Sequence, residues 1–435
     1  MNGVRFKLSA MMFLEFFIWG AWYPLIFGYL PSLGFGSEWE QPLILGTFNI
    51  GAVLALFFST QFADRNFAAE RFLSFSQLVG GLAMLGLFWV KKPEGSESAA
   101  FWPFFGLLLL HSIFYVPTIS ITNSIAFANL RDPQKEFGPV RLWGTIGWIA
   151  AAWPLFFLLQ GKQGAEFRQA TSYIFVVAGV ASLVLAGFSL FLPHTPPKPA
   201  GEATEKLAWL EAMKLLAIPF VLVLFVVTFF DSAVHQIYFS WTERFLTAPA
   251  DRFGVGISGE WAMPVMSIGQ VAEIGTLAFL ALALKQLGWR YTMVIGILGH
   301  AVRFTVFALL PFAVPAILAN LLHGICYAFF FATVYMFVDE FFPKDARSSA
   351  QGLFNVLILG VGPFVGNFLG TRLGSIFKVG EYTDATGSPQ PIIDFSKLFL
   401  VPAGIALFAA IILLLFFRPP ARKETEGKEP APAAH

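Results

Sequence analysis

Residues 137–148 read FGPVRLWGTIGW, and the apolar segment 149–159 follows them directly. As a helix, the two together are long enough to reach deep into a bilayer. Arg141 then lies near the membrane surface, with Thr145 and Trp148 on its face at i+4 and i+7. A fixed positive charge there costs roughly 2.5 kcal/mol or more unless it is paired or faces water. Arg141 therefore either faces a polar cavity or extends to the lipid headgroups, and the helix alone leaves both open.

The composition indicates a polytopic helical membrane protein. The 435 residues are 57% hydrophobic and only 13% charged, and a soluble protein could not bury that much apolar surface with so few charges. A formal net charge of +1 gives no reason to expect a nucleic-acid partner. The single cysteine, Cys326, excludes an intramolecular disulfide and argues against a metal cluster. The apolar stretch 11–30 contains Glu15 and precedes no small-residue cleavage site, so we expect a retained first helix rather than a signal peptide.

Twelve apolar runs of membrane-spanning length follow one another along the chain. If the N-terminus is cytoplasmic, the cytoplasmic segments carry twice as many lysine and arginine residues as the opposite ones, which predicts that both termini are cytoplasmic. The run 101–129 is long enough to tilt or to break near Pro117. The twelve runs are 8–30, 42–63, 72–90, 101–129, 139–160, 171–192, 216–240, 261–284, 289–310, 313–338, 347–371 and 396–417.

A polar interruption at 193–215 divides the runs into two sets of six. We therefore expect an N-terminal six-helix bundle over 1–192, a cytoplasmic linker over 193–215 and a C-terminal six-helix bundle over 216–418. An amphipathic linker helix is expected around 206–216. The tail 419–435 is rich in Lys, Glu, Pro and Ala and is predicted to be disordered.

Short charged turns occupy the same place in both halves, at 63–71 after the second run and at 285–290 after the eighth. The first resembles a degraded signature loop of the major facilitator superfamily, with Asp64, Arg65 and Arg71 retained. Together with twelve runs and a central linker, this resemblance implies the facilitator fold, an all-α membrane protein of two six-helix halves. In that fold the cargo site lies near the bilayer midplane, between the halves.

Ionisable residues inside membrane spans are candidates for function. Gln270 and Glu273 are three residues apart and share one helix face, where they suit hydrogen bonding to hydroxyl groups. A desolvated carboxylate can also take up a proton. The alternative is a polar clamp between two helices. Glu15 likewise either carries a proton or forms a structural hydrogen bond to a neighbouring helix.

Two further spans carry polar residues. In the seventh, Gln236 follows Asp231 and His235, which are four residues apart and could simply pair with each other. In the tenth, His323 and Tyr327 share a face, so a stacking or hydrogen-bonding partner accompanies the histidine. A lone helical histidine is more often structural, and Tyr327 is the reason to keep His323 as a candidate.

Five segments together resemble the bacterial nucleoside:proton symporter family, a branch of the major facilitator superfamily. They occur in the family's order over nearly the whole chain, and the Arg-hydrophobe-Trp-Gly-Thr-Ile-Gly segment is specific. These segments are 13–22, 115–118, 140–147, 266–273 and 347–352.

The resemblance implies a nucleoside cavity in which amide and carboxylate groups bind ribose hydroxyls or base edges and aromatic rings sandwich the base. Three positions depart from the family pattern: Phe239 and Ala328 stand where relatives carry an asparagine and an acid, and Glu15 replaces an amide. These departures bear on substrate choice and on the coupling acid. The implied cavity residues are Arg141, Thr145, Trp148, Gln236, Gln270, Glu273 and Tyr327.

We therefore predict a transporter that imports nucleosides with protons by alternating access, with Glu273 or Glu15 as the coupling acid. It is expected to be monomeric, to lie in the cytoplasmic (inner) membrane and to need no cofactor. A carrier of another polar solute, such as a sugar or modified nucleoside, is the nearest alternative. An intramembrane enzyme is disfavoured because the six histidines show no close metal-ligand spacing. A sensor would normally add a soluble output domain.

Overall fold

A computed structural model describes residues 3–35, 39–58, 67–91, 100–197, 213–342, 344–383 and 389–419. Within these ranges, each of the twelve predicted runs is helical, and the eighth and ninth share the single helix α12. Asp64 and Arg65 of the expected signature loop lie outside the described residues. So do most of the expected linker helix and the tail from residue 420 onward.

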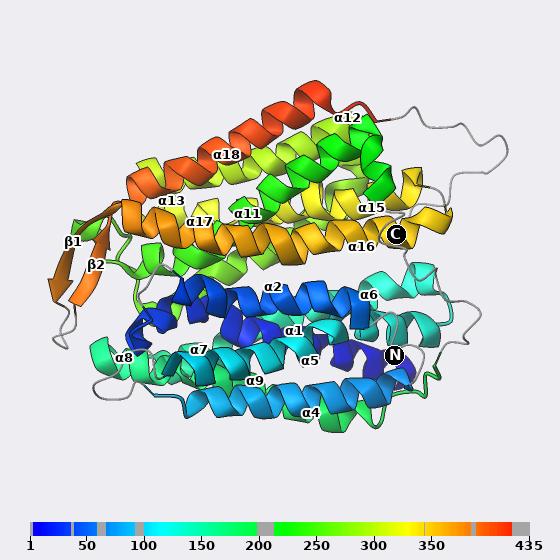
Figure 1. The fold of residues 1–435 in the computed structure, drawn as a ribbon, viewed down its shortest axis with the longest axis horizontal. Coiled ribbons are helices and arrows are strands. Elements are labelled where there is room, and N and C mark those ends of the chain that lie inside the picture. The colour runs from blue at the N-terminus through cyan, green and yellow to red at the C-terminus, as the bar shows by residue number, and fades with distance from the viewer. Residues whose placement is uncertain are drawn as a thin grey trace.

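The helices form two bundles that lie one above the other in Figure 1. In the first bundle, α1 packs against α6 and α9, and α4 packs against α5 and α9. Its helices are α1 (Gly3–Tyr29), α2 (Glu40–Phe58), α4 (Ala69–Phe88), α5 (Phe101–Asn129), α6 (Pro133–Ala150), α7 (Ala152–Leu159), α8 (Gly164–Thr171) and α9 (Tyr173–Ser189).

In the second bundle, α12 packs against α14 and α18, and α11 packs against α17 and α18. Two π-helical turns, η7 and η8, interrupt its tenth and eleventh spans. Its elements are α11 (Pro219–Thr247), α12 (Ala262–Leu309), α13 (Ala313–Ala319), α14 (Leu322–Cys326), η7 (Tyr327–Ala332), α15 (Thr333–Phe341), α16 (Lys344–Asn355), η8 (Val356–Val361), α17 (Gly362–Ile376) and α18 (Phe395–Phe416).

The segment 137–148 lies in α6, but the helix starts at Pro133, earlier than predicted. Asp132 caps it, because its side chain accepts a hydrogen bond from the backbone N–H of Lys135, and Pro139 lies inside the helix. Gly147 lets α6 approach α1 closely, since a β-carbon there would lie 2.1 Å from the carbonyl oxygen of Phe13. Of the two alternatives for 101–129, a tilt or a break near Pro117, the break is not found, because α5 is continuous from Phe101 to Asn129.

Helix α12 contains both the eighth and the ninth predicted spans. Gly288 separates them with φ of 71° and ψ of 174°, a backbone conformation that only glycine adopts without strain. The charged turn predicted at 285–290 therefore exists as a break within one long helical stretch.

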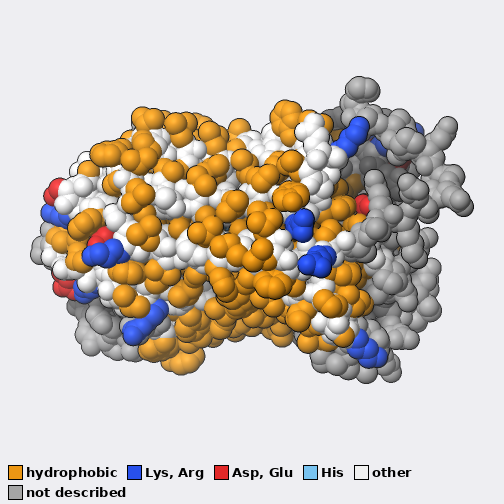
Figure 2. Space-filling view, turned by 90° about the horizontal axis from the view of Figure 1, so that it is seen from above, with side chains coloured by type: hydrophobic (Ala, Val, Ile, Leu, Met, Phe, Trp, Pro, Cys, Tyr) orange, Lys and Arg blue, Asp and Glu red, His pale blue; other side chains and the backbone are white. Residues whose placement is uncertain are grey.

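The surface is that of a membrane protein. Ten helical stretches of the described residues are long and apolar enough to cross a bilayer. Hydrophobic side chains cover most of the face in Figure 2, and charged side chains gather toward its two ends. A small antiparallel hairpin, β1 (Lys378–Thr383) with β2 (Pro389–Ile393), projects from one end and was not predicted.

Candidate substrate site

A cavity of about 150 Å³ lies between the two bundles, and side chains from both of them line it. All eight residues that the sequence predicts for substrate binding lie on its wall. From the first bundle these are Arg141, Thr145 and Trp148; from the second they are Gln236, Gln270, Glu273, His323 and Tyr327.

Arg141 faces this cavity rather than being left as an isolated charge at the membrane surface. Its guanidinium carbon lies 3.9 Å from the centre of the Phe16 ring, a cation–π contact. Gly144 makes room for this pair, since a β-carbon there would lie 2.6 Å from the Arg141 Nη1 and 2.7 Å from the Phe16 ring. Arg141 also interacts electrostatically with Glu273 of the other bundle. Glycine three residues after Arg141 thus leaves room for the guanidinium to lie against the Phe16 ring.

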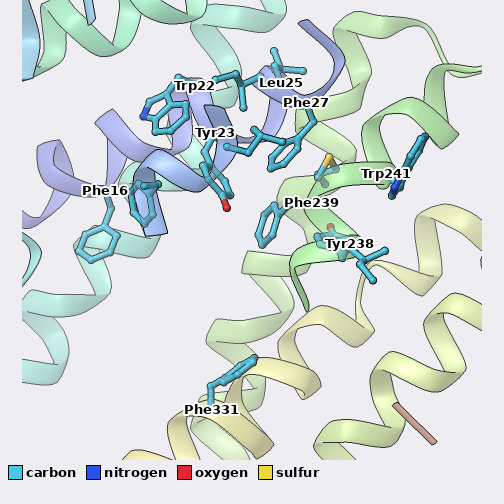
Figure 3. Packing of buried hydrophobic residues seen from close by; sticks show 14 of the residues in the cluster. Phe16, Trp22, Tyr23, Leu25, Phe27, Tyr238, Phe239, Trp241 and Phe331 are labelled. Atoms are coloured by element: carbon cyan, nitrogen blue, oxygen red, sulfur yellow. The ribbon is translucent and has the colours of Figure 1, made fainter. Parts of the chain in front are cut away.

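Aromatic rings form one wall of the cavity. Trp19 stacks on Phe48 with ring centres 4.7 Å apart and meets Trp148 edge-on at 5.2 Å. Across the boundary between the bundles, Tyr23 meets Phe239 edge-on with ring centres 5.5 Å apart, and Figure 3 shows these two rings next to each other. Such a wall offers flat surfaces for stacking against a heterocyclic ring.

Gln236 ties the two bundles together beside the cavity. Its Oε1 accepts a hydrogen bond from the Tyr23 hydroxyl at 2.9 Å, and its Nε2 donates to Asn367 Oδ1 at 2.8 Å. Asn367 Nδ2 in turn donates to Asn49 Oδ1 at 3.2 Å. Asn49 Nδ2 donates to the carbonyl of Leu359 in η8 at 2.9 Å. Three of these four bonds cross between the bundles, so a rearrangement that separates the bundles must break them.

Gln270 and Glu273 lie on α12, where it packs against α14. Gly324 permits this packing, because a β-carbon there would lie 2.4 Å from the backbone of Glu273. Tyr327, which begins the π-helical turn η7, lines the cavity beside them. π-Helical turns are frequent at functional sites because they redirect side chains locally.

Glu15 does not line the cavity. It lies inside the first bundle, fully buried, and accepts hydrogen bonds from Thr118 Oγ1 at 2.6 Å and Gln77 Nε2 at 2.9 Å. The Tyr115 hydroxyl donates to the Glu15 backbone carbonyl at 2.6 Å. Of the two acids considered for proton coupling, only Glu273 faces the cavity.

The pairing of Asp231 with His235 that the spacing allowed is not found. Asp231 instead faces His300 on α12, with Oδ2 3.7 Å from Nε2, and His235 Nδ1 has no hydrogen-bond partner among the described residues. His300 and His323 both contact the guanidinium of Arg303. Arg303 and His300 were not among the residues predicted to have a role. The sequence does carry a signal for Arg303, because a fixed charge inside an apolar run is the feature that singled out Arg141.

Comparison with known proteins agrees with this architecture. The sequence model described as nucleoside H+ symporter matches residues 1–422. The chain belongs to the nucleoside H+ symporter family. It is 32% identical over 421 residues to the putative nucleoside transporter YegT of Escherichia coli, covering 95% of this chain and 93% of that protein. It is 26% identical to the xanthosine permease of the same organism, covering 95% and 96% of the two chains.

Solved structures show the same fold. The crystal structure of the nucleoside transporter NupG superimposes with a TM-score of 0.78 at 24% identity, covering 96% of this chain and all of that one. A D-xylose-proton symporter superimposes with a TM-score of 0.71 at 13% identity, covering 97% of this chain and all of that one. The family member described here therefore has the major facilitator fold. It is a multi-pass membrane transporter that carries nucleosides with protons, and it is not an enzyme.

Proposed function

We propose that the cavity between the bundles is the nucleoside site. The observation that carries this proposal is the convergence of all eight predicted residues on one cavity wall built from both bundles. Arg141, Gln236, Gln270 and Glu273 provide hydrogen-bonding groups for ribose hydroxyls and base edges, and Thr145 adds a hydroxyl. Trp148 and Tyr327 provide rings for the base, and His323 completes the site behind Gln270.

Glu273 is the coupling acid in this proposal, and Glu15 is the second candidate. Glu273 faces the cavity and opposes Arg141, so a proton on its carboxyl group changes the charge that a bound nucleoside meets. Protonation of Glu273 removes a buried negative charge and releases Arg141 from its partner, so the loaded site can reorient. Glu15 has no such access, since its carboxylate is enclosed by Thr118 and Gln77.

Alternating access then follows from rocking of the two bundles, 1–192 and 216–418, about the cavity. Arg244 of α11 donates to the carbonyl of Phe27 through Nε at 3.0 Å and to Gln41 Oε1 at 3.0 Å, so the bundles are joined where α1 ends. These ties and the chain through Gln236 must break for the site to open on that side. We place the protein in the cytoplasmic membrane, with both termini and the 193–215 linker on the cytoplasmic face, because the lysine and arginine bias favours that orientation. We propose a monomer, because one chain completes the cavity.

Glu273→Gln tests the coupling role. The variant keeps the side-chain shape but cannot take up a proton, so we expect uphill accumulation driven by a pH gradient to be lost while counterflow of nucleoside across proteoliposomes persists. Uptake of uridine and adenosine, with glucose as competitor, also separates a nucleoside carrier from a sugar carrier.

The matched control is Glu381→Gln, the same chemical change on the exposed strand β1. It should accumulate nucleoside as the unmodified protein does. Undiminished uphill uptake by Glu273→Gln would exclude Glu273 as the coupling acid and leave Glu15 as the remaining candidate.

A further inference from the structure

A buried polar cluster lies directly behind the cavity wall in the second bundle. At its centre is Arg303, which is fully buried and has its guanidinium carbon 3.9 Å from the centre of the Tyr238 ring. Nη2 of Arg303 lies 2.8 Å from His300 Nδ1, and Nη1 lies 3.1 Å from His323 Nδ1. His323 Nε2 in turn lies 3.3 Å from the side-chain amide of Gln270, which lines the cavity.

The guanidinium determines the protonation of both histidines. An arginine side chain has donors only and remains charged, so each ring nitrogen that faces it must accept a hydrogen bond. Nδ1 of His300 and Nδ1 of His323 are therefore unprotonated, and each neutral ring carries its hydrogen on Nε2. Protonation of either ring would cost it the bond to Arg303 and bring two positive charges together in a buried site.

The Nε2–H of His300 is directed toward Asp231, the carboxylate of this cluster. Asp231 is fully buried, and its Oδ2 lies 3.7 Å from His300 Nε2. The His300 imidazole thus lies between Asp231 and the buried Arg303. His235 packs against both rings, with its ring centre 5.4 Å from that of His300 and 5.0 Å from that of His323.

The Nε2–H of His323 determines how Gln270 is turned. The amide nitrogen of Gln270 at 3.3 Å would set a donor against a donor, while Oε1 of Gln270 is buried with no hydrogen-bond partner among the described residues. A half-turn of the amide removes the donor–donor contact, because the oxygen then accepts from His323. The NH₂ group then takes the position that has no hydrogen-bond partner among the described residues, which leaves it free for an acceptor on a ligand. The NH₂ group is thereby directed away from His323.

We propose that His323, held by Arg303, orients Gln270 so that its NH₂ group faces the bound nucleoside and recognises a hydrogen-bond acceptor on it. This assignment rests on the proposed nucleoside site. Arg303 and His323 are positioning residues, since they act through Gln270. The site then combines donors at Arg141 and Gln270 with an acceptor at Glu273, which fits a ligand presenting both carbonyl and hydroxyl groups.

Gln270→Glu tests the orientation without disturbing His323. A carboxylate still accepts from the His323 Nε2–H but presents an oxygen, not an NH₂ group, to the ligand. We expect KM for the nucleoside that the protein accumulates best, uridine or adenosine, to rise about tenfold or more, the effect of one lost hydrogen bond. Unchanged KM and selectivity in this variant would show that the oxygen already faced the ligand and would overturn the proposal.

A double-mutant cycle tests the positioning role. Gln270→Ala and His323→Phe should each raise KM about tenfold and weaken discrimination against analogues that lack one carbonyl or one ribose hydroxyl. Together they should cost no more than either alone. His323→Gln, whose amide can accept from Arg303 and donate to Gln270, should stay within about threefold of the unmodified protein.

Independent, multiplicative losses in the double variant would refute positioning through Gln270, as would unchanged selectivity in a folded His323→Phe protein. If His323→Phe does not fold, the His323→Gln and Gln270→Glu variants still decide the matter. If Gln270→Ala leaves KM unchanged, the proposed nucleoside site itself fails. If only the His323 variants behave as unmodified protein, the site stands and the positioning role fails.

Discussion

Each bundle buries a polar cluster that includes an acid of its first helix, Glu15 in α1 and Asp231 in α11, and the two clusters are built in opposite ways. In the first bundle, both carboxylate oxygens of Glu15 accept hydrogen bonds, from Thr118 and from Gln77. In the second, neither oxygen of Asp231 has a hydrogen-bond partner among the described residues, and Nε of Arg303 also has none. The cluster around Glu15, whose carboxylate oxygens are hydrogen-bonded, is closed off from the cavity. The cluster around Arg303, which leaves buried polar atoms without hydrogen bonds, reaches the cavity through His323.

The satisfied cluster tolerates either protonation state of Glu15. Thr118 Oγ1 lies 2.6 Å from Glu15 Oε1 and 2.5 Å from the Tyr115 carbonyl, so its single hydrogen can point to either oxygen. Gln77 is fixed on its other side, since Ser182 donates to its Oε1 at 2.6 Å. The first bundle therefore behaves as a stable scaffold, and the second holds the groups whose arrangement depends on one another.

Arg303→Met should have the largest effect on stability. It leaves the carboxylate of Asp231 buried without a cation, and removing one partner of a buried charge pair typically costs about 3–5 kcal/mol. We expect a clear drop in the thermal unfolding midpoint of the purified protein in detergent, with partial recovery when Asp231→Asn is added.

Arg290→Met is the matched control on the same helix, where the arginine is at the surface beside Tyr291. It should change the free energy of unfolding by no more than about 0.5 kcal/mol. If Arg303→Met and Arg290→Met had the same thermal unfolding midpoint, the cluster would carry little charge and the contrast between the bundles would be wrong.

Glu15→Gln should have a much smaller effect. The new amide can donate to Thr118 Oγ1 and accept from Gln77 Nε2, so the free energy of unfolding should change by less than about 1 kcal/mol. Glu15→Leu removes both acceptors and should cost about 1–3 kcal/mol for each buried donor left unpaired. Thermal unfolding of the two variants checks this difference.

Transport by the same Glu15→Gln protein distinguishes the two acids. If Glu273 couples protons to transport, this variant should still accumulate nucleoside against its gradient. Loss of accumulation in a stable Glu15→Gln protein would assign the coupling role to Glu15 and would locate proton coupling in the first bundle.

The sequence could predict the elements that repeat a local pattern. The apolar runs and the residues at helical spacing from Arg141 and Gln270 follow from period and length. The two-bundle fold was predicted from the twelve runs and the central linker together with the resemblance of the turn at 63–71 to a facilitator loop. The cluster around Arg303 could not be found this way, because Asp231, His300 and His323 come from three different helices and meet only in the folded bundle. Tyr23 was missed for the same reason, since its partner Gln236 lies in the other bundle.

Tyr23→Phe tests the boundary between the bundles rather than either interior. It removes the hydroxyl that donates to Gln236 Oε1 and so weakens only the state in which the bundles are closed at this end. A loss of about 1 kcal/mol shifts that equilibrium roughly fivefold. A cysteine introduced at Thr247, the last residue of α11, reports the shift by faster reaction with a thiol reagent, because the one native cysteine, Cys326, is buried.

Tyr335→Phe is the control for this measurement. The Tyr335 hydroxyl donates to Asn355 within the second bundle, so labelling at residue 247 should not change. Equal labelling in both variants would mean that the Tyr23–Gln236 bond does not hold the bundles together.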